Sequence, residues 1–153
     1  MAQNEVYKGI LGWASWFMPM SWLVTGIGLI FFVINLIVAG VTFQQVERVK
    51  INSISVNWQM GMIVMEGGLV TFPAGGFNRG NFSFIDPGHG GVTDHELGHG
   101  LNLAAYGWVF HYVGAIDENV VQENPHDAYS EHLAESNQAT PDHTPPSLDM
   151  WTA

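Results

Sequence analysis

A five-residue stretch, His95-Glu96-Leu97-Gly98-His99, holds the residue types that zinc chemistry requires, at a spacing that suits a helix. Residues four apart lie about 40° from each other around an α-helix, so the imidazoles of His95 and His99 can reach one ion. Glu96 then points to the side, where its carboxylate can take a proton from a metal-bound water. The stretch therefore predicts a Zn²⁺ site on a helix, with Glu96 as the general base.

A catalytic zinc site needs a third protein ligand and one open position for water. The histidine of the extended metzincin pattern is missing, because the sixth residue after His99 is Ala105. The third ligand must therefore be another acidic residue or histidine. The candidates that remain open are Glu131, Asp117, Glu118, Glu123, His111 and His126.

The chain resembles small bacterial, membrane-associated zincin-like metallopeptidases of the gluzincin type, in which an HExGH helix precedes a Gly-aromatic turn. The matching pieces are residues 80–84, 95–99, 107–114 and 129–131. The resemblance implies zinc held by His95, His99 and Glu131, with Glu96 as general base. In gluzincin-type sites an acidic residue follows the ligating glutamate by four positions. Glu135 would here accept the outer N–H of a ligating imidazole and fix its tautomer.

Two alternatives remain beside this interpretation. Residues 95–114 also look locally like the first motif of site-2-type intramembrane proteases, which would take Asp127 or Asp117 as third ligand. However, residues 78–94 are polar and rich in glycine, which suits hydrocarbon depth poorly. The other alternative is a non-catalytic membrane protein whose histidine pair is a structural or vestigial metal site.

The charge of the chain excludes one large class of partners. The chain has four Lys and Arg residues and 14 Asp and Glu residues, which gives a formal net charge of −10 at pH 7. Such a chain cannot neutralise a run of phosphates, so we exclude nucleic acid as a partner. The chain has no cysteine, which excludes disulfides, cysteine zinc ligands and thiol catalysis. No charge lies between Lys8 and Val46, and this points to a membrane bilayer as a partner.

Residues 22–43 form an uncharged stretch of 22 residues, long enough to cross the hydrocarbon core as a helix. Trp16 and Trp22 lie near one end, as expected of an interfacial aromatic belt. Pro19 separates this helix from residues 10–18, which we expect to lie along the interface. The chain is thus predicted to be a single-pass membrane protein. A buried core helix and a cleaved signal peptide stay open, as does the side of the membrane on which the remaining chain lies.

The remaining elements follow from turn residues and hydrophobic spacing. Residues 44–57 are expected to continue the helix or form a linker. We predict strands at residues 61–65, 69–72 and 81–85. The zinc-motif helix begins at Thr93 or Asp94 and ends at Gly107, with Leu97, Leu101 and Trp108 able to face a core. Residues 108–116 can be a strand, a second helix or a membrane-touching segment, and residues 127–136 form a short helix.

These expectations give an α+β fold. Residues 1–45 form an interfacial segment and a transmembrane helix, residues 46–136 a zincin-like domain, and residues 137–153 a disordered tail. In the domain, a small and mostly antiparallel sheet packs on the zinc-motif helix. The expected function is hydrolysis of peptide or protein substrates by a membrane-anchored zinc peptidase, with an edge strand within residues 69–84 holding the extended peptide. Candidates for stabilising the oxyanion are Tyr106, His111, His126 and Tyr129.

Overall fold

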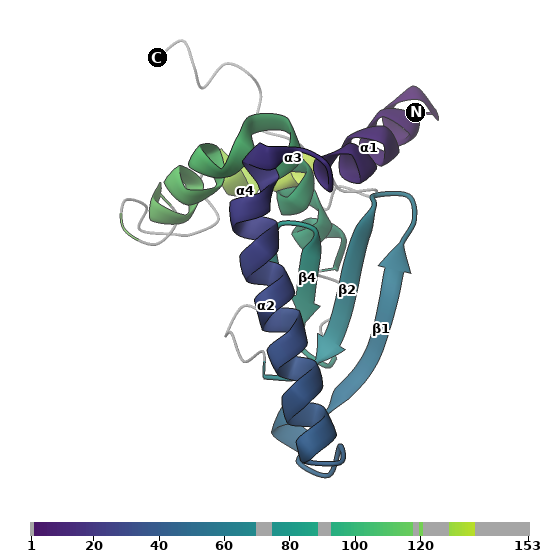
Figure 1. The fold of residues 1–153 in the computed structure, drawn as a ribbon. Coiled ribbons are helices and arrows are strands. Elements are labelled where there is room, and N and C mark those ends of the chain that lie inside the picture. The colour runs from purple at the N-terminus through teal and green to yellow at the C-terminus, as the bar shows by residue number, and fades with distance from the viewer. Residues whose placement is uncertain (1, 70–74, 89–92, 118–119, 121–128, 137–153) are drawn as a thin grey trace.

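The structure is a computed structural model that describes residues 2–69, 75–88, 93–117, 120 and 129–136. Its elements are α1 (Ala2–Ser15), α2 (Pro19–Val41), the 3₁₀ turn η1 (Glu47–Val49), β1 (Ile51–Asn57), β2 (Met62–Gly67), β3 (Gly76–Arg79), β4 (Phe82–Ile85), α3 (Thr93–Ile116) and α4 (Tyr129–Ser136). Helices are mixed with one four-stranded sheet, so the predicted α+β class is confirmed. Helix α2 runs along one face of the sheet, and α3 and α4 gather near its upper end (Figure 1).

The two N-terminal helices separate at Pro19, as the sequence predicts. Proline suits the first turn of a helix, because its φ is already helical and its missing N–H has no partner to lose there. The helix ends at Val41, just before Phe43 and Gln44 take left-handed conformations. Within the part of the chain that the structure describes, α2 is the one helix long and apolar enough to cross a membrane, with a mean hydropathy of 2.5.

The sheet begins earlier in the chain than the sequence indicates. Residues 51–57 form β1, so the expectation of a helix or linker over residues 44–57 is wrong for this part. Most side chains of β1 are exposed, and the strand is held by antiparallel pairing with β2 rather than by a local apolar pattern. Predicted strands at 61–65 and 81–85 correspond to β2 and β4, whereas β3 was not predicted. Leu69 lies in no strand, and residues 70–72 fall outside the described residues.

The strand order is β1-β2-β4-β3. β1 with β2 and β3 with β4 pair antiparallel, while β2 with β4 pair parallel, so the sheet is mostly antiparallel as expected. The β3–β4 turn contains Gly80, whose φ of 71° is in the left-handed region that favours glycine. A Cβ at this position would also overlap the main chain of Thr25 in α2. Strand β3 is therefore an edge strand held close to α2.

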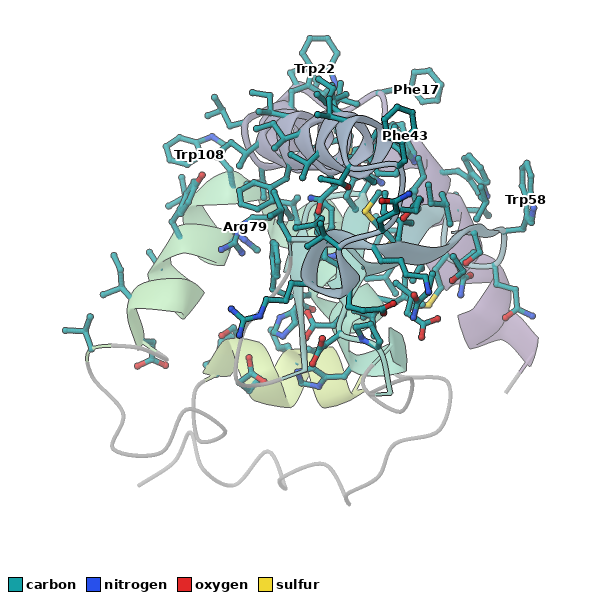
Figure 2. All side chains as sticks on the ribbon, turned by 90° about the horizontal axis from the view of Figure 1, so that it is seen from below. Phe17, Trp22, Phe43, Trp58, Arg79 and Trp108 are labelled. Carbon is teal, nitrogen blue, oxygen red and sulfur yellow. The ribbon has the colours of Figure 1, made fainter. Side chains whose placement is uncertain are left out.

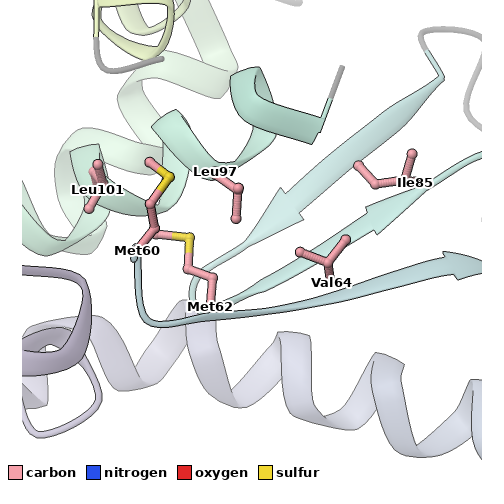
Figure 3. Packing of buried hydrophobic residues seen from close by; sticks show 6 residues of the cluster. All are labelled: Met60, Met62, Val64, Ile85, Leu97 and Leu101. Carbon is pink, nitrogen blue, oxygen red and sulfur yellow. The ribbon is translucent and has the colours of Figure 1, made fainter. Parts of the chain in front are cut away.

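Alternation along β2 and β4 gives the middle of the sheet two buried faces. On one face, Met62, Val64 and Ile85 pack against Leu97 and Leu101 of α3 (Figure 3). The turn that precedes β2 adds Met60 to this cluster. This packing confirms the expectation that the sheet lies on the zinc-motif helix. The central strands are thus covered by the element that carries the metal-ligand candidates.

The other face of the sheet packs against α2 through aromatic side chains. Phe82 and Phe84 of β4 are buried there. The ring of Phe32 lies 5.4 Å from that of Phe82, and the ring of Phe31 lies 6.0 Å from that of Phe84. The two central strands, β2 and β4, are therefore enclosed between α2 and α3.

Buried Asn81, in the turn between β3 and β4, connects the sheet to both N-terminal helices. Its Nδ2 donates to Ser15 Oγ at 2.5 Å, and its Oδ1 accepts from Thr25 Oγ1 at 2.9 Å. Further along α2, the side-chain oxygen of Asn35 accepts a hydrogen bond from the main-chain N–H of Leu69. These contacts cross the predicted boundary between residues 45 and 46, so α1, α2 and the sheet share one core.

Candidate metal centre

The zinc motif occupies the first two turns of α3, which begins at Thr93, one of the two predicted starts. Leu97 and Leu101 are buried against the sheet, and this fixes the rotation of the helix about its axis. His95 and His99 consequently point away from the sheet, one turn apart and half-buried. Both imidazoles are therefore presented to whatever packs on the outer side of α3.

Gly107 bends α3 sharply, because its φ of 82° and ψ of 178° are not helical. The first helical part thus ends where the sequence predicts, and a second helical part follows from residue 108 to 116. Gly107 lies beside Met20 at the start of α2, where an added Cβ would be 3.4 Å from Met20 Sδ. The bend takes Trp108 out of the buried stripe and leaves it 39% exposed, so the expectation that it faces a core is wrong.

Helix α4 approaches α3 closely because two glycines leave room for it. A Cβ at Gly98, inside the zinc motif, would lie 2.3 Å from the carbonyl oxygen of Ala134. A Cβ at Gly114, beyond the bend, would lie 2.6 Å from the Cβ of Ser130. Asn102 Nδ2 adds a hydrogen bond of 3.3 Å to the carbonyl oxygen of Ser130. Contacts on both sides of the bend thus hold α4 across the motif.

This packing brings Glu131 onto the two histidines. Glu131 Oε2 lies 2.8 Å from His95 Nε2, and Glu131 Oε1 lies 3.1 Å from His99 Nε2. The two Nε2 atoms are 3.2 Å apart, and the rings stand nearly perpendicular at 87°. Among the described residues, His95, His99 and Glu131 form a group whose ligand atoms all lie within 4.8 Å of one another. Glu131 is the third ligand that the resemblance to gluzincin-type sites implies.

The spacing of these atoms suits a tetrahedral zinc ion. Ligand atoms about 2.0–2.1 Å from zinc in a tetrahedron are about 3.3 Å from each other. The two Nε2 atoms, 3.2 Å apart, are close to that value, and the Glu131 carboxylate places one oxygen 2.8 Å from His95 Nε2 and the other 3.1 Å from His99 Nε2. Two imidazole nitrogens and one carboxylate oxygen are also a donor set that catalytic zinc accepts. The residues present therefore fit the metal that the motif implies.

The carboxylate of Glu131 remains ionised although it is buried. Burial raises its pKa, but hydrogen bonds from His95 and His99, and the charges of these imidazoles, lower it more. The net result is a pKa well below the usual range of a glutamate. Glu131 is 6% exposed, so an unpaired charge here would be costly, and the paired imidazoles offset that cost.

The side chain of Glu96, the second residue of the zinc motif, lies beside the edge strand β3. Its carboxylate side chain is 7% exposed. A Cβ added at Gly76, the first residue of β3, would be 3.3 Å from Glu96 Cγ. The proposed general base is therefore adjacent to the edge strand and shares α3 with both histidines.

Asp117, one of the alternative ligands, is engaged elsewhere. Its Oδ2 accepts a hydrogen bond of 3.2 Å from the main-chain N–H of Tyr129, the first residue of α4. This contact satisfies an N–H at the start of a helix that has no intrahelical partner. Asp117 thus stabilises the beginning of the helix that carries Glu131 and does not join the group of three.

The charge of His99 affects the pKa of His111, which lies in the second part of α3 and is not one of the three grouped ligand candidates. Burial and, to a smaller extent, the positive charges of Arg79 and His99 together lower its pKa from 6.5 to about 4. Arg79, at the end of β3, lies over the Phe77 ring at 5.1 Å and donates to the Asn78 carbonyl oxygen. His111 is therefore a neutral imidazole at neutral pH.

Several predicted residues cannot be placed. Glu118, Glu123, His126 and Asp127 lie outside the described residues, as does the predicted tail at residues 137–153. Glu135 belongs to α4 and Tyr106 to α3, but their side chains lie outside the described part. The expected role of Glu135 as a hydrogen-bond acceptor for a ligating imidazole therefore stays a prediction.

The two glycines that let α4 dock, Gly98 and Gly114, were not predicted from the sequence. The signal for Gly98 was present, because glycine is a poor helix former and its position inside a helical motif calls for a packing reason. Comparison with known proteins adds no family: no protein-family model matches the chain, and no curated protein or solved structure shows significant similarity to it. The resemblance to zincin-like peptidases therefore stays a prediction from the motifs.

Proposed function

We propose that the protein is a zinc-dependent peptidase whose metal is held by His95, His99 and Glu131. The convergence of their three ligand atoms from two helices, with Glu131 32 positions after His99, carries this proposal. Two histidines at i and i+4 form a common surface pattern. A buried carboxylate brought onto both of them by a separate helix is not explained by that pattern.

The remaining chemistry belongs to Glu96. A zinc ion in this centre would supply Lewis acidity, which polarises a scissile carbonyl and makes water acidic enough to attack at neutral pH. Glu96 accepts the proton of the attacking water and later delivers it to the leaving amine. Its place beside the two histidines and its low exposure support this role.

The edge strand β3 is a suitable support for the substrate. A peptide in extended conformation can add to the free edge of a sheet through main-chain hydrogen bonds. Because Gly76 of β3 adjoins Glu96, a peptide on this edge would bring its main chain near the general base. This supports a peptide or protein substrate.

His111 is the candidate that we propose for stabilising the oxyanion. It is neutral at pH 7, so it can donate one hydrogen bond without bringing a cation against the metal. The other described candidate, Tyr129, is 40% exposed at the start of α4. His111→Gln should therefore lower turnover while the zinc content is kept.

We further propose that the peptidase acts at a membrane and retains α2. The length and hydropathy of α2 support membrane association. Retention is supported by the contacts of Thr25 and Asn35 with the sheet, since a cleaved signal peptide would not contribute to the folded core.

One variant pair tests the proposed mechanism. Glu96→Gln should keep the zinc but lower hydrolysis of a quenched fluorescent peptide library by about 10²–10⁴-fold, because the general base is lost. Glu47→Gln, at an exposed glutamate far from the centre, is the matched control and should match the parent. A Glu96→Gln protein as active as the parent would contradict the mechanism. Zinc without any hydrolysis in the parent would favour a structural metal site.

A further inference from the structure

Helix α2 turns its polar and small residues toward its own protein. Its buried residues are Ser21, Val24, Thr25, Gly28, Asn35 and Ala39, of which Val24 is the one large apolar side chain. They recur at helical spacing along the side that contacts the sheet. In a water-soluble helix this side would carry the large apolar residues. Apart from Val24 and the two aromatic residues that contact the sheet, Phe31 and Phe32, the large apolar residues of α2 instead point away from the rest of the protein.

The opposite side of α2, here called the outer face, consists of Leu23, Ile30, Ile34, Ile37 and Val41. Each of these side chains is between 43% and 73% exposed. No polar side chain interrupts the outer face, and no charged residue lies between Lys8 and Val46. Protein–protein interfaces carry a polar rim with hydrogen-bonding groups, so this face matches hydrocarbon better than a second protein surface.

Aromatic residues extend the outer face at both ends of the helix. Figure 2 looks along α2 and places Phe17, Trp22 and Phe43 on its outer side, with Trp108 of α3 beside it. Tryptophan is favoured at the boundary between headgroups and acyl chains. Helix α4, which carries Glu131, lies on the opposite side of the molecule.

A spanning orientation of α2 conflicts with the way the sheet packs on it. At Gly28, near the middle of α2, an added Cβ would lie 2.2 Å from the carbonyl oxygen of Arg79. If α2 crossed the bilayer, Arg79 and the sheet would be carried to hydrocarbon depth. The exposed side chains of Asn52, Ser53 and Ser55 in β1, and the main-chain edge of β1 that no described strand pairs with, would then lose water without gaining partners.

We infer that α2 lies in the plane of a lipid surface, with its outer face in one leaflet and the metal centre turned toward water. An ordinary interfacial helix turns its polar face toward water. In this protein, the rest of the domain packs on that side of α2 instead. Substrates would then reach the centre from the aqueous side. The inference builds on the proposed membrane association, but it does not depend on zinc binding or on hydrolysis.

Cysteine labelling separates a helix in the plane from a spanning helix. The chain has no cysteine, so a single introduced thiol reports one position. Ile10→Cys precedes α2 and Ser55→Cys follows it, and both sites are exposed. In sealed vesicles of defined orientation, a membrane-impermeant maleimide should label both thiols from the same side. Labelling from opposite sides would show a spanning helix and overturn the inference.

Flotation with phosphatidylcholine vesicles tests the lipid contact itself. The Ile30→Asp/Ile37→Asp variant should reduce co-flotation by about tenfold or more, because two exposed apolar side chains that enter the lipid are replaced by charges. Ile54→Asp, at a 45% exposed isoleucine of β1, is the matched control and should float like the parent. Added salt should not release the parent, since its charge of −10 offers no attraction to lipid phosphates.

Three results would overturn the inference: an unchanged flotation of the double variant, an equal loss in Ile54→Asp, or a parent that dimerises through this face and stays off vesicles. Near-UV circular dichroism shows whether the double variant is folded, and if that variant is unfolded, the labelling result decides. Loss of hydrolysis with intact labelling and flotation would contradict the proposed function and leave this inference standing.

Discussion

Gly98 of α3 lies directly against the main chain of Ala134 of α4, where an added Cβ would be 2.3 Å from the carbonyl oxygen. A helix carbonyl cannot retreat without moving its helix. The glycine of the HELGH motif is thus the contact that allows Glu131 to reach His95 and His99. The ligand geometry depends on a residue that itself binds nothing.

Gly98→Ala should therefore weaken zinc binding although all three ligands remain. We expect α4 to be pushed outward and the zinc affinity to fall by about tenfold or more, similar to the loss of an outer-sphere partner. Competition with a chromophoric chelator measures this affinity. Gly40→Ala is the matched control, because a Cβ at Gly40 meets nothing within 4 Å. Equal zinc affinities for the two variants would refute the proposed role of this contact.

Asn81 should be important for stability because it joins α1, α2 and the sheet. Asn81→Ala removes hydrogen bonds with Ser15 and Thr25 and leaves those buried groups without this partner. The free energy of unfolding should fall by about 1–3 kcal/mol. Chemical denaturation in detergent, followed by near-UV circular dichroism, provides the measurement. Asn52→Ala, at an exposed position of β1, should change the value by less than about 0.5 kcal/mol.

His111 should titrate far below an ordinary histidine in the metal-free protein. Its pKa is lowered from 6.5 to about 4, first by burial and then by Arg79 and His99. The folded state thus favours the neutral imidazole. Its contribution to stability is complete above about pH 6.5 and is lost as the pH falls toward 4. An NMR titration of the His111 ring protons gives the pKa directly.

Arg79→Gln should raise this pKa part of the way back, because one positive charge is removed while burial, the larger cause, remains. Arg48→Gln, at an exposed arginine in η1, should leave the titration unchanged. If both variants titrate like the parent, Arg79 does not act on His111.

The sequence could predict the parts of the centre that depend on local spacing. The i, i+4 histidines, the start of their helix near Thr93 and its end at Gly107 follow from residue types alone. Residues 44–57 could not be assigned correctly, because β1 is held by its pairing with β2 and has no buried apolar stripe. The outward position of Trp108 was missed for a similar reason, since the bend at Gly107 changes which side of α3 faces the core.

The packing of α2 on the sheet was also beyond the sequence. An uncharged stretch of this length predicts a membrane helix whether or not a domain packs along it. Asn35 is the one strongly polar residue in the span, and its hydrogen bond to Leu69 explains its presence. Gly28 and Thr25 gave no signal, because small residues are common in membrane helices for other reasons.

Zinc stoichiometry in three matched proteins tests the central claim most directly. By mass spectrometry of the metal, the parent should hold about one zinc per chain, and Glu131→Ala should hold almost none. Asp117→Ala, which removes a hydrogen bond to the start of α4 but no ligand, should retain the metal. Full zinc in Glu131→Ala together with loss in Asp117→Ala would contradict the account, since the third ligand would then not be Glu131.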